Sequence, residues 1–156
     1  MSGEKTVIGV VSDTHGLFRP ELESLLKGAD LIIHAGDVGS TSVFGQLEMI
    51  APVKAVRGNT DRMPPLVDFP ETEIVQAGDT LIYLLHDISR LDLDPSAASM
   101  DVVVYGHSHK AHIEKKNGVL YFNPGSAGPR RFRTTPSCGV LEIEGKEITP
   151  TVYNIG

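Results

Sequence analysis

The stretch Val102–His109, VVVYGHSH, combines a short apolar run, a glycine and two histidines one residue apart. The apolar run is typical of a buried strand, and side chains along a strand repeat with a period of two. His107 and His109 would therefore project to the same side as the chain leaves the strand, which is a spacing found in metal ligands. Two imidazoles on a solvated turn would give the same motif, so its meaning depends on the rest of the sequence.

The overall composition indicates one folded domain. The chain has 156 residues, of which 40% are hydrophobic and 22% are charged, close to ordinary globular usage. We therefore expect a single soluble domain over residues 1–156. Cys138 is the only cysteine, so no disulfide can form within the chain, and we expect it to be a small core side chain on a strand. No stretch resembles a signal peptide or a membrane span, which favours a cytoplasmic protein.

The net charge limits the binding partners. Fourteen Lys and Arg residues stand against twenty Asp and Glu residues, a formal charge of -6. This charge disfavours a broad electrostatic contact with nucleic acid or an anionic membrane. A local basic cluster follows residue 129, with arginines at Arg130, Arg131 and Arg133. This cluster is either a solvated basic run or a site that holds a substrate phosphate bidentately.

Several apolar runs end in residues that can bind metal ions. The runs cover residues 6–11, 30–35, 52–57, 80–85 and 102–106, and the ligand types that follow them are Asp13, His15, Asp37, Asn59, His86, His107 and His109. Each run has the length and composition of a strand. In open α/β sheets the loops at the carboxyl ends of the strands converge on one crevice. We therefore expect these seven side chains to be neighbours in space.

The segments between these runs predict the remaining elements. Helical patterns cover residues 20–27 and about 41–50, the second with Ser40 or Thr41 as its N-cap, and a weak helical pattern covers residues 89–100. Hairpins are predicted to turn at Gly78-Asp79, at Asn117-Gly118 and at Gly145. The proline-rich residues 62–71 are interpreted as a surface loop beside the site. The sequence thus predicts an α/β fold.

Seven candidate ligands are too many for one metal ion. They suit two ions that share a bridging carboxylate, roughly 3.5 to 4 Å apart, an arrangement that clamps the attacking and leaving oxygens of a phosphoryl displacement. Imidazole and carboxylate ligands without a thiolate favour Mn, Fe, Co, Ni or Zn over Ca or over a Mg site built only from oxygens.

The motifs DTH at 13–15, GD at 36–37, GN at 58–59, His86 and GHSH at 106–109 occur in this order, and in them the chain resembles the calcineurin-like metallophosphoesterases. The small size and the NPGS of residues 123–126 resemble the YfcE-type phosphodiesterases, a branch that includes the Vps29 retromer subunit. The resemblance runs from about Val7 to Ile143. It implies a metallophosphoesterase sandwich of two mixed β-sheets flanked by α-helices.

The resemblance also implies a ligand set for each of two divalent transition-metal ions. One ion would be bound by Asp13, His15, Asp37 and His109, and the other by Asp37, Asn59, His86 and His107, so that Asp37 bridges them. Mn is the first expectation, ahead of Ni, Fe, Co and Zn. The implied reaction is attack of a metal-bound hydroxide on a small phosphodiester, in which Asp37, Asn59 and His107 take catalytic roles. Asn59 is neutral, so it can orient a substrate oxygen without cancelling the charge of the ions.

Two positions depart from the family pattern. Thr60 stands where many relatives have a histidine that is held to protonate the leaving group, so poor leaving groups should be cleaved slowly. Asp87 follows His86 where relatives usually have glycine, and would narrow the loop or supply a hydrogen-bond acceptor to a ligand histidine. His34, inside a predicted strand, is expected to be structural rather than a ligand, and His112 to be a hairpin side chain.

Two other functional classes remain open. A Vps29-like interaction module would use the same fold without catalysis, and degraded ligand positions would favour it, but none of the seven is degraded. A nuclease is weakened by the net acidity and would show salt-dependent binding to single-stranded DNA. The sequence leaves open the oligomeric state, including a homo-oligomer, and the identity of the substrate.

Overall fold

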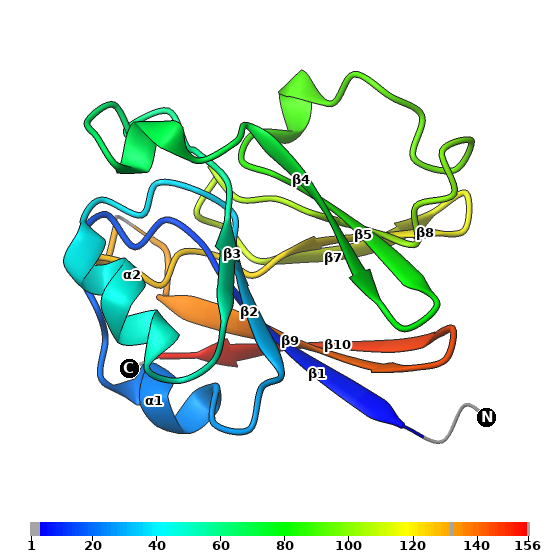
Figure 1. The fold of residues 1–156 in the computed structure, drawn as a ribbon, viewed down its shortest axis with the longest axis horizontal. Coiled ribbons are helices and arrows are strands. Elements are labelled where there is room, and N and C mark those ends of the chain that lie inside the picture. Colours follow the sequence, from blue (N-terminus) through cyan, green and yellow to red (C-terminus); the bar gives the residue numbers. More distant parts are fainter. Residues whose placement is uncertain (1–3, 132, 156) are drawn as a thin grey trace.

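The computed structural model describes residues 4–131 and 133–155. Two five-stranded sheets face each other across a common core (Figure 1). Each sheet contains both parallel and antiparallel strand pairs. The predicted sandwich of two mixed sheets is therefore confirmed.

The first sheet has the strand order β10-β9-β1-β2-β3. Its strands are β1 (Lys5–Val11), β2 (Leu31–His34), β3 (Val53–Ala55), β9 (Ser137–Glu144) and β10 (Glu147–Asn154). β1, β2 and β3 are parallel, and the pairing of Val11 with His34 and of His34 with Ala55 brings their carboxyl ends level. The loops that follow these three strands therefore begin at one edge of the sheet.

The second sheet has the strand order β4-β5-β6-β8-β7. Its strands are β4 (Thr72–Ala77), β5 (Thr80–Leu85), β6 (Val102–Val104), β7 (His112–Lys116) and β8 (Val119–Asn123). The three central strands are parallel, and Leu84, Val104 and Phe122 are aligned in register at their carboxyl ends. The predicted hairpins at Gly78-Asp79, Asn117-Gly118 and Gly145 are confirmed.

The alternation of side chains along β1 explains the layers. Ile8 and Val10 face the second sheet and belong to the core between the sheets, whereas Val11 faces the other way. On that outer face the sheet is covered by α1 (Glu21–Leu25) and α2 (Thr41–Glu48). Ser40 caps α2 as predicted, because its hydroxyl oxygen accepts a hydrogen bond from the Val43 N–H at 3.2 Å.

The outer face of the second sheet is covered without an α-helix. The predicted weak helix over residues 89–100 is wrong: only a 3₁₀ turn, η2 (Ile88–Arg90), forms there. Pro95 disfavours helical backbone at Asp94, whose carboxylate instead accepts a hydrogen bond from the Ser96 N–H at 3.1 Å. The segment still buries apolar side chains, because Ile88, Leu91 and Leu93 pack on the outer face of the sheet.

Smaller elements also differ from the sequence-based expectation. The helix predicted over residues 20–27 is shorter, and the loop predicted over residues 62–71 contains a 3₁₀ turn, η1 (Leu66–Asp68). Cys138 lies buried in β9 as expected, and burial raises the pKa of its thiol to about 12. None of the helices in the described residues is both long enough and apolar enough to cross a bilayer.

Candidate metal centre

The structure brings all seven predicted ligands to one edge of the sandwich, which we call the site end. They follow five strands that end there, β1, β2, β3, β5 and β6. Asp13 and Asp37 are buried, and His86 is 5% exposed. The backbone that carries the ligands is not the extended strand predicted from the period of two. β6 ends at Val104, and the ligands lie in tight loops beyond the strands.

Two buried carboxylates form the centre of the site. Asp13 uses Oδ2 to accept hydrogen bonds from the Ser12 hydroxyl at 2.6 Å and from the His107 N–H at 3.0 Å. Asp37 uses Oδ1 to accept a hydrogen bond from the Thr60 N–H at 2.9 Å. In both residues the second oxygen is left to face imidazole rings. Each carboxylate thus has one oxygen fixed by the protein and one oxygen presented to the site.

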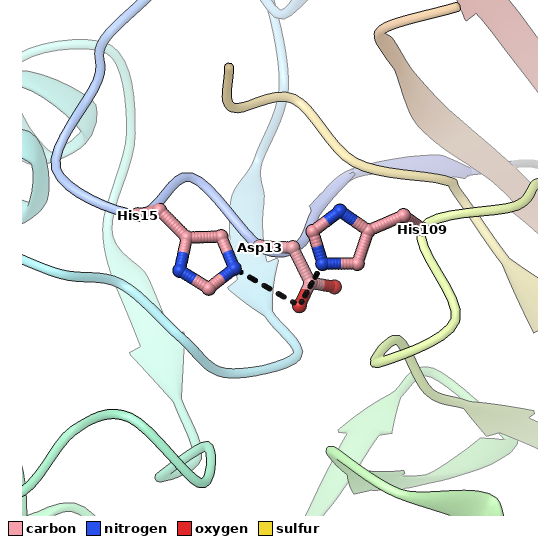
Figure 2. A group of neighbouring side chains, drawn as sticks. All are labelled: Asp13, His15 and His109. Atoms are coloured by element: carbon pink, nitrogen blue, oxygen red, sulfur yellow. Dashed lines mark ion pairs between the residues drawn. The ribbon is translucent and has the colours of Figure 1, made fainter. Parts of the chain in front are cut away.

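Two histidines face the presented oxygen of Asp13 (Figure 2). Its Oδ1 lies 3.7 Å from His15 Nε2 and 3.4 Å from His109 Nε2. The two imidazole rings are stacked with centroids 5.3 Å apart. Asp13 Oδ1 and His15 Nε2 are both buried without a hydrogen-bond partner. Buried polar atoms rarely lack a partner, so this convergence fits a bound cation.

A second group lies around the presented oxygen of Asp37. Its Oδ2 is 3.2 Å from His86 Nε2 and 3.6 Å from His15 Nε2. His86 Nε2 is also 3.0 Å from Asn59 Oδ1 and 3.3 Å from His107 Nδ1. The second predicted ligand set is therefore assembled around one nitrogen atom.

The contact made by Nδ1 fixes the tautomer of His86. Nδ1 lies 2.7 Å from the backbone carbonyl oxygen of Ala35, which can only accept, so Nδ1 carries a proton. In the neutral ring Nε2 then has a free lone pair directed at the site. Ligand histidines are commonly oriented in this way by a carbonyl or carboxylate on the far nitrogen. His86 is thus held in the form that can bind a metal ion.

The electrostatics of the metal-free site couple His86 to Asp37. Burial opposes the charged form of both groups. Hydrogen bonds from His86 and the Thr60 N–H outweigh burial at Asp37 and hold the pKa of its carboxyl well below its usual range. At His86 the hydrogen bond with Asp37 and the charge of Asp13 likewise outweigh burial and raise its pKa. Asp37 is therefore ionised, as a bridging ligand must be.

Five of the seven predicted ligands have left-handed backbone. Positive φ angles occur at Asp13 (56°), His15 (46°), Asp37 (57°), His107 (74°) and His109 (64°). This conformation costs an L-residue other than glycine about 1–2 kcal/mol. Such strain persists only where the surrounding structure fixes it, and it is concentrated at functional sites. The backbone angles are independent of the side-chain distances, and both indicate the same residues as a functional site.

Glycines before two of the ligands allow the loops to touch. A Cβ atom at Gly58 would collide with Asp37 Oδ1 and with the Asp37 backbone nitrogen. A Cβ atom at Gly106 would collide with the Ser12 hydroxyl and with Asp13 Oδ2 at 2.6 Å. The glycine of each motif therefore makes room for a carboxylate contributed by another loop.

Residues 123–126 support the site without belonging to the predicted ligand set. Asn123 Nδ2 donates to the Gly106 carbonyl oxygen at 3.2 Å and to the Ser108 hydroxyl at 3.1 Å. Ser126 donates its hydroxyl to the Asp13 carbonyl oxygen at 3.0 Å. In the sequence these residues are distinguished only by the family resemblance. A signal was available, because they are polar residues directly after the apolar run of β8.

Two further polar residues, Asp61 and His112, have structural positions. Asp61 is buried, and its carboxylate accepts hydrogen bonds from the N–H groups of Val38, Gly39 and Gly58 at 3.0 to 3.2 Å. It therefore ties two ligand loops together. His112 lies on β7 with its Nε2 3.0 Å from Glu114 Oε1, away from the site as expected for a hairpin side chain.

The departures from the family pattern are both located beside the site. Thr60 is exposed. Asp87 Oδ2 lies 3.9 Å from His107 Nε2, which is too far for a direct hydrogen bond. Partial burial opposes ionisation of Asp87, but hydrogen bonds from Ser89 outweigh it and lower the pKa of the carboxyl. Burial lowers the pKa of His109, and the positive charge of Arg131, from the basic cluster, lowers it further.

The distances do not distinguish Asp37 from Asp13 as the bridging residue. Asp13 Oδ1 also lies 3.8 Å from His86 Nε2. Asp13 therefore belongs to two possible ligand groups: one with His15 and His109, and one with Asp37 and His86. Within each group one ligand atom per residue lies within 4.8 Å of the others. The arrangement fits divalent cations, whereas the assignment of single ligands to single ions stays a prediction.

A cleft of about 1000 Å³ opens beside the second ligand group. Asn59, His86 and His107 are among the residues that line it. Arg62 and Arg90 line its walls with Tyr83, Leu85 and Asp87, among others. The cleft is large enough to receive a small-molecule substrate.

The sequence profile of the calcineurin-like phosphoesterase superfamily domain matches residues 7–146. The chain belongs to this superfamily. A probable metallophosphoesterase of Methanothermobacter thermautotrophicus is 32% identical over 96% of this chain and 93% of its own. A phosphodiesterase of Methanocaldococcus jannaschii is 30% identical over 90% of this chain and 95% of its own.

Solved structures agree with this assignment. The structure of Vps29 from Entamoeba histolytica complexed with Zn²⁺ superposes with a TM-score of 0.79 and 26% identity, covering 96% of this chain and 92% of that one. The calcineurin-like family is therefore shown both by sequence and by fold. This metallophosphoesterase is thus similar both to a phosphodiesterase and to Vps29, a vacuolar protein sorting protein.

Proposed function

We propose that the metallophosphoesterase binds two divalent transition-metal ions at the site end and hydrolyses small phosphodiesters. One observation carries the proposal: the buried Asp13 Oδ1 has no hydrogen-bond partner and converges with the imidazoles of His15 and His109, beside the buried carboxylate of Asp37. Asp13, His15, Asp37, Asn59, His86, His107 and His109 would hold the ions. When bound, such ions polarise the phosphoryl group and lower the pKa of a water molecule.

The residues of the chain supply the orientation. The hydrogen bonds to Asp13 Oδ2 and Asp37 Oδ1 fix both carboxylates before any ligand arrives. His86 donates its Nδ1 proton to the Ala35 carbonyl oxygen, so Nε2 is the nitrogen that faces the site. Asn59, which is exposed and lines the cleft, would orient a phosphoryl oxygen through its amide. The substrate would lie in the cleft between Arg62 and Arg90.

The proton for the leaving group does not come from the two aspartates beside Thr60 and His86. The Asp61 carboxylate is fully occupied by backbone N–H groups, and the lowered pKa of Asp87 keeps it ionised at neutral pH. Thr60 has no acidic proton to give in this range. The enzyme should therefore favour diesters whose leaving group departs without protonation, such as aryl esters.

The Vps29 likeness supports a second candidate function, a metal-binding interaction module without catalysis. Vps29 from Entamoeba histolytica has this fold and was crystallised with Zn²⁺. The two functions agree on metal binding and differ in turnover. Both are compatible with a cytoplasmic location, and the metal we expect first is Mn²⁺.

The test is hydrolysis by chelator-treated protein reloaded with Mn²⁺. We expect bis(4-nitrophenyl) phosphate to be cleaved faster than 4-nitrophenyl phosphate. His109→Ala should remove the activity, whereas His112→Ala, which changes an exposed histidine three positions away, should keep it. If wild type bound Mn²⁺ but cleaved neither ester, the interaction module would be favoured. If it cleaved only the monoester, the diester assignment would be wrong.

A further inference from the structure

A buried histidine behind the ligands uses both ring nitrogens for hydrogen bonds. His34 is the last residue of β2 and is 0% exposed. Its Nδ1 accepts a hydrogen bond from the Gly36 N–H at 3.0 Å. Its Nε2 lies 2.9 Å from Thr14 Oγ1, and the Thr14 hydroxyl donates its proton to the Val38 carbonyl oxygen at 2.8 Å. Thr14 Oγ1 must therefore accept from Nε2–H, which fixes the neutral tautomer of His34.

The two groups that His34 joins lie in different ligand loops. Thr14 stands between Asp13 and His15, and Gly36 directly precedes Asp37. The loops also touch through their backbones, because the Asp13 N–H donates to the Gly36 carbonyl oxygen at 3.0 Å. Three predicted ligands in these loops have left-handed backbone: Asp13, His15 and Asp37. Conformations of this kind need contacts that hold them.

His34 is suited to a fixed role. Burial lowers its pKa to about 3, with a further contribution from the charge of His86, so it stays neutral at ordinary pH. Neither ring nitrogen is available to a metal ion, because one accepts and the other donates within the protein. Its hydrogen bonds are made to the chain beside the ligands and not to the ligands themselves.

We propose that His34 is a positioning residue: its imidazole joins the Asp13–His15 loop to the Asp37 loop and so sets the spacing of the two carboxylates and the affinity of the site for metal ions. This inference rests on the metal-binding part of the proposed function and not on hydrolysis. Groups that orient metal ligands from behind are commonly worth about 10–100-fold in metal affinity.

The experiment measures Co²⁺ binding to chelator-treated protein by competition with a chromogenic chelator and by the visible absorption of the bound ion. Thr14→Val removes the hydroxyl that His34 contacts. His34→Asn keeps an acceptor near the Gly36 N–H but is too short to reach Thr14. We expect each variant to bind Co²⁺ about 10–100-fold more weakly and with a changed absorption spectrum. The double variant should lose no more than either single variant, because both remove one contact.

Thr80→Val is the matched control. Thr80 is also 0% exposed, and its hydroxyl donates to the Gly145 carbonyl oxygen at 3.1 Å at the opposite end of the molecule. Thermal unfolding of the metal-free proteins should show a similar loss of stability for Thr80→Val and Thr14→Val. Thr80→Val should bind Co²⁺ as wild type does, which separates positioning of the ligands from general destabilisation.

Wild-type Co²⁺ affinity and spectrum in Thr14→Val and His34→Asn would overturn the proposal, and so would an equal loss of affinity in Thr80→Val. Losses that multiply in the double variant would show that the two residues act separately. A wild-type protein that binds no Co²⁺ would also contradict it. A wild-type protein that binds Co²⁺ but hydrolyses no diester would refute the proposed reaction and leave the role of His34 intact.

Discussion

The two ends of the sandwich place left-handed backbone on different kinds of residue. At the end formed by the hairpin turns, which we call the hairpin end, Gly78, Gly118, Gly145 and Asn117 have positive φ angles. Glycine and asparagine adopt this conformation at little cost and are the expected residues of such turns. At the site end aspartates and histidines adopt the same conformation, in addition to glycines such as Gly16 and Gly36. Strain is thus concentrated where the predicted ligands are.

The two ends also differ in how deeply their polar residues are buried. At the hairpin end Gly78, Asp79, Asn117 and Gly118 are exposed. At the site end Asp13 and Asp37 are buried although they are charged, and Asp13 Oδ1 has no hydrogen-bond partner. A buried charge without a partner is unfavourable. The contrast supports the proposal that cations bind at the site end.

The largest effect that this comparison predicts is on two aspartates. Asp37→Ala should reduce diester hydrolysis to background, because it removes a carboxylate that faces histidines of both ligand groups. Asp79→Ala, in an exposed turn of the hairpin end, should leave the rate unchanged. Steady-state hydrolysis of bis(4-nitrophenyl) phosphate measures both. Equal activity of the two variants would remove the functional distinction between the ends.

A second prediction concerns Thr60 at the site end. General acid catalysis is typically worth about 10²–10⁴-fold, so alkyl diesters should be cleaved far more slowly than activated aryl diesters. Thr60→His should raise the rate on poor leaving groups if the new imidazole reaches the leaving oxygen. A series of esters with leaving groups of increasing pKa measures this dependence. A flat series in the wild-type enzyme would show that another group already supplies the proton.

Glycines at the two ends should respond differently to alanine. Gly58→Ala forces a Cβ atom into the Asp37 carboxylate, so metal affinity should fall by about 10–100-fold, as for other changes that displace a ligand. Gly78→Ala meets no atom within 4 Å but keeps a φ of 59°, so it should lower the free energy of unfolding by about 1–2 kcal/mol without changing metal affinity. Metal titration and denaturant unfolding separate these effects.

The smallest predicted effect is a graded dependence on pH. The pKa of His86 is raised above its ordinary value of about 6.5 in the metal-free protein. As the pH falls, protons therefore begin to compete with metal for Nε2 at a higher pH than they would at an ordinary histidine. Metal affinity should therefore fall by roughly tenfold per pH unit as the pH drops below the raised pKa. In the metal-free protein the sign is opposite: stability from protonated His86 is present at low pH and lost as the pH rises through its folded pKa.

Equilibrium dialysis with Mn²⁺ between pH 5 and 8 measures the first effect, and thermal unfolding with a chelator measures the second. Activity should likewise rise from acid toward alkaline pH. Metal occupancy that did not change over this range would count against histidine ligation. His112→Ala, which alters an exposed histidine outside the site, should follow the wild-type profile.

Much of the fold could be predicted because local signals and tertiary structure agree. Buried strands such as Thr6–Val11 have a continuous apolar pattern, and Asn117-Gly118 has the composition of a hairpin turn. The gathering of the seven side chains followed from topology, since parallel strands end at a common edge. The helix predicted over residues 89–100 failed because apolar burial on the second sheet, together with Pro95, prevails over a weak helical pattern.

Details of the candidate site could not be predicted in the same way. Aspartate and histidine adopt left-handed backbone more often than most residues but still uncommonly, so nothing local predicts the φ angles of Asp13 or His107. The hydrogen bonds of His34 and Asn123 join loops that are far apart in the sequence, and depend on register between strands. His34 was correctly expected to be structural, but its connection to Thr14 required the folded arrangement.

The central claim is that the site end binds two divalent ions through the seven predicted ligands. Its most direct test is elemental analysis of chelator-treated wild-type protein after dialysis against Mn²⁺, alongside Asp37→Ala and Asp79→Ala. We predict two ions per chain for wild type and Asp79→Ala, and a loss from both sites in Asp37→Ala. Two ions retained in Asp37→Ala, or none bound by the wild type, would contradict the account.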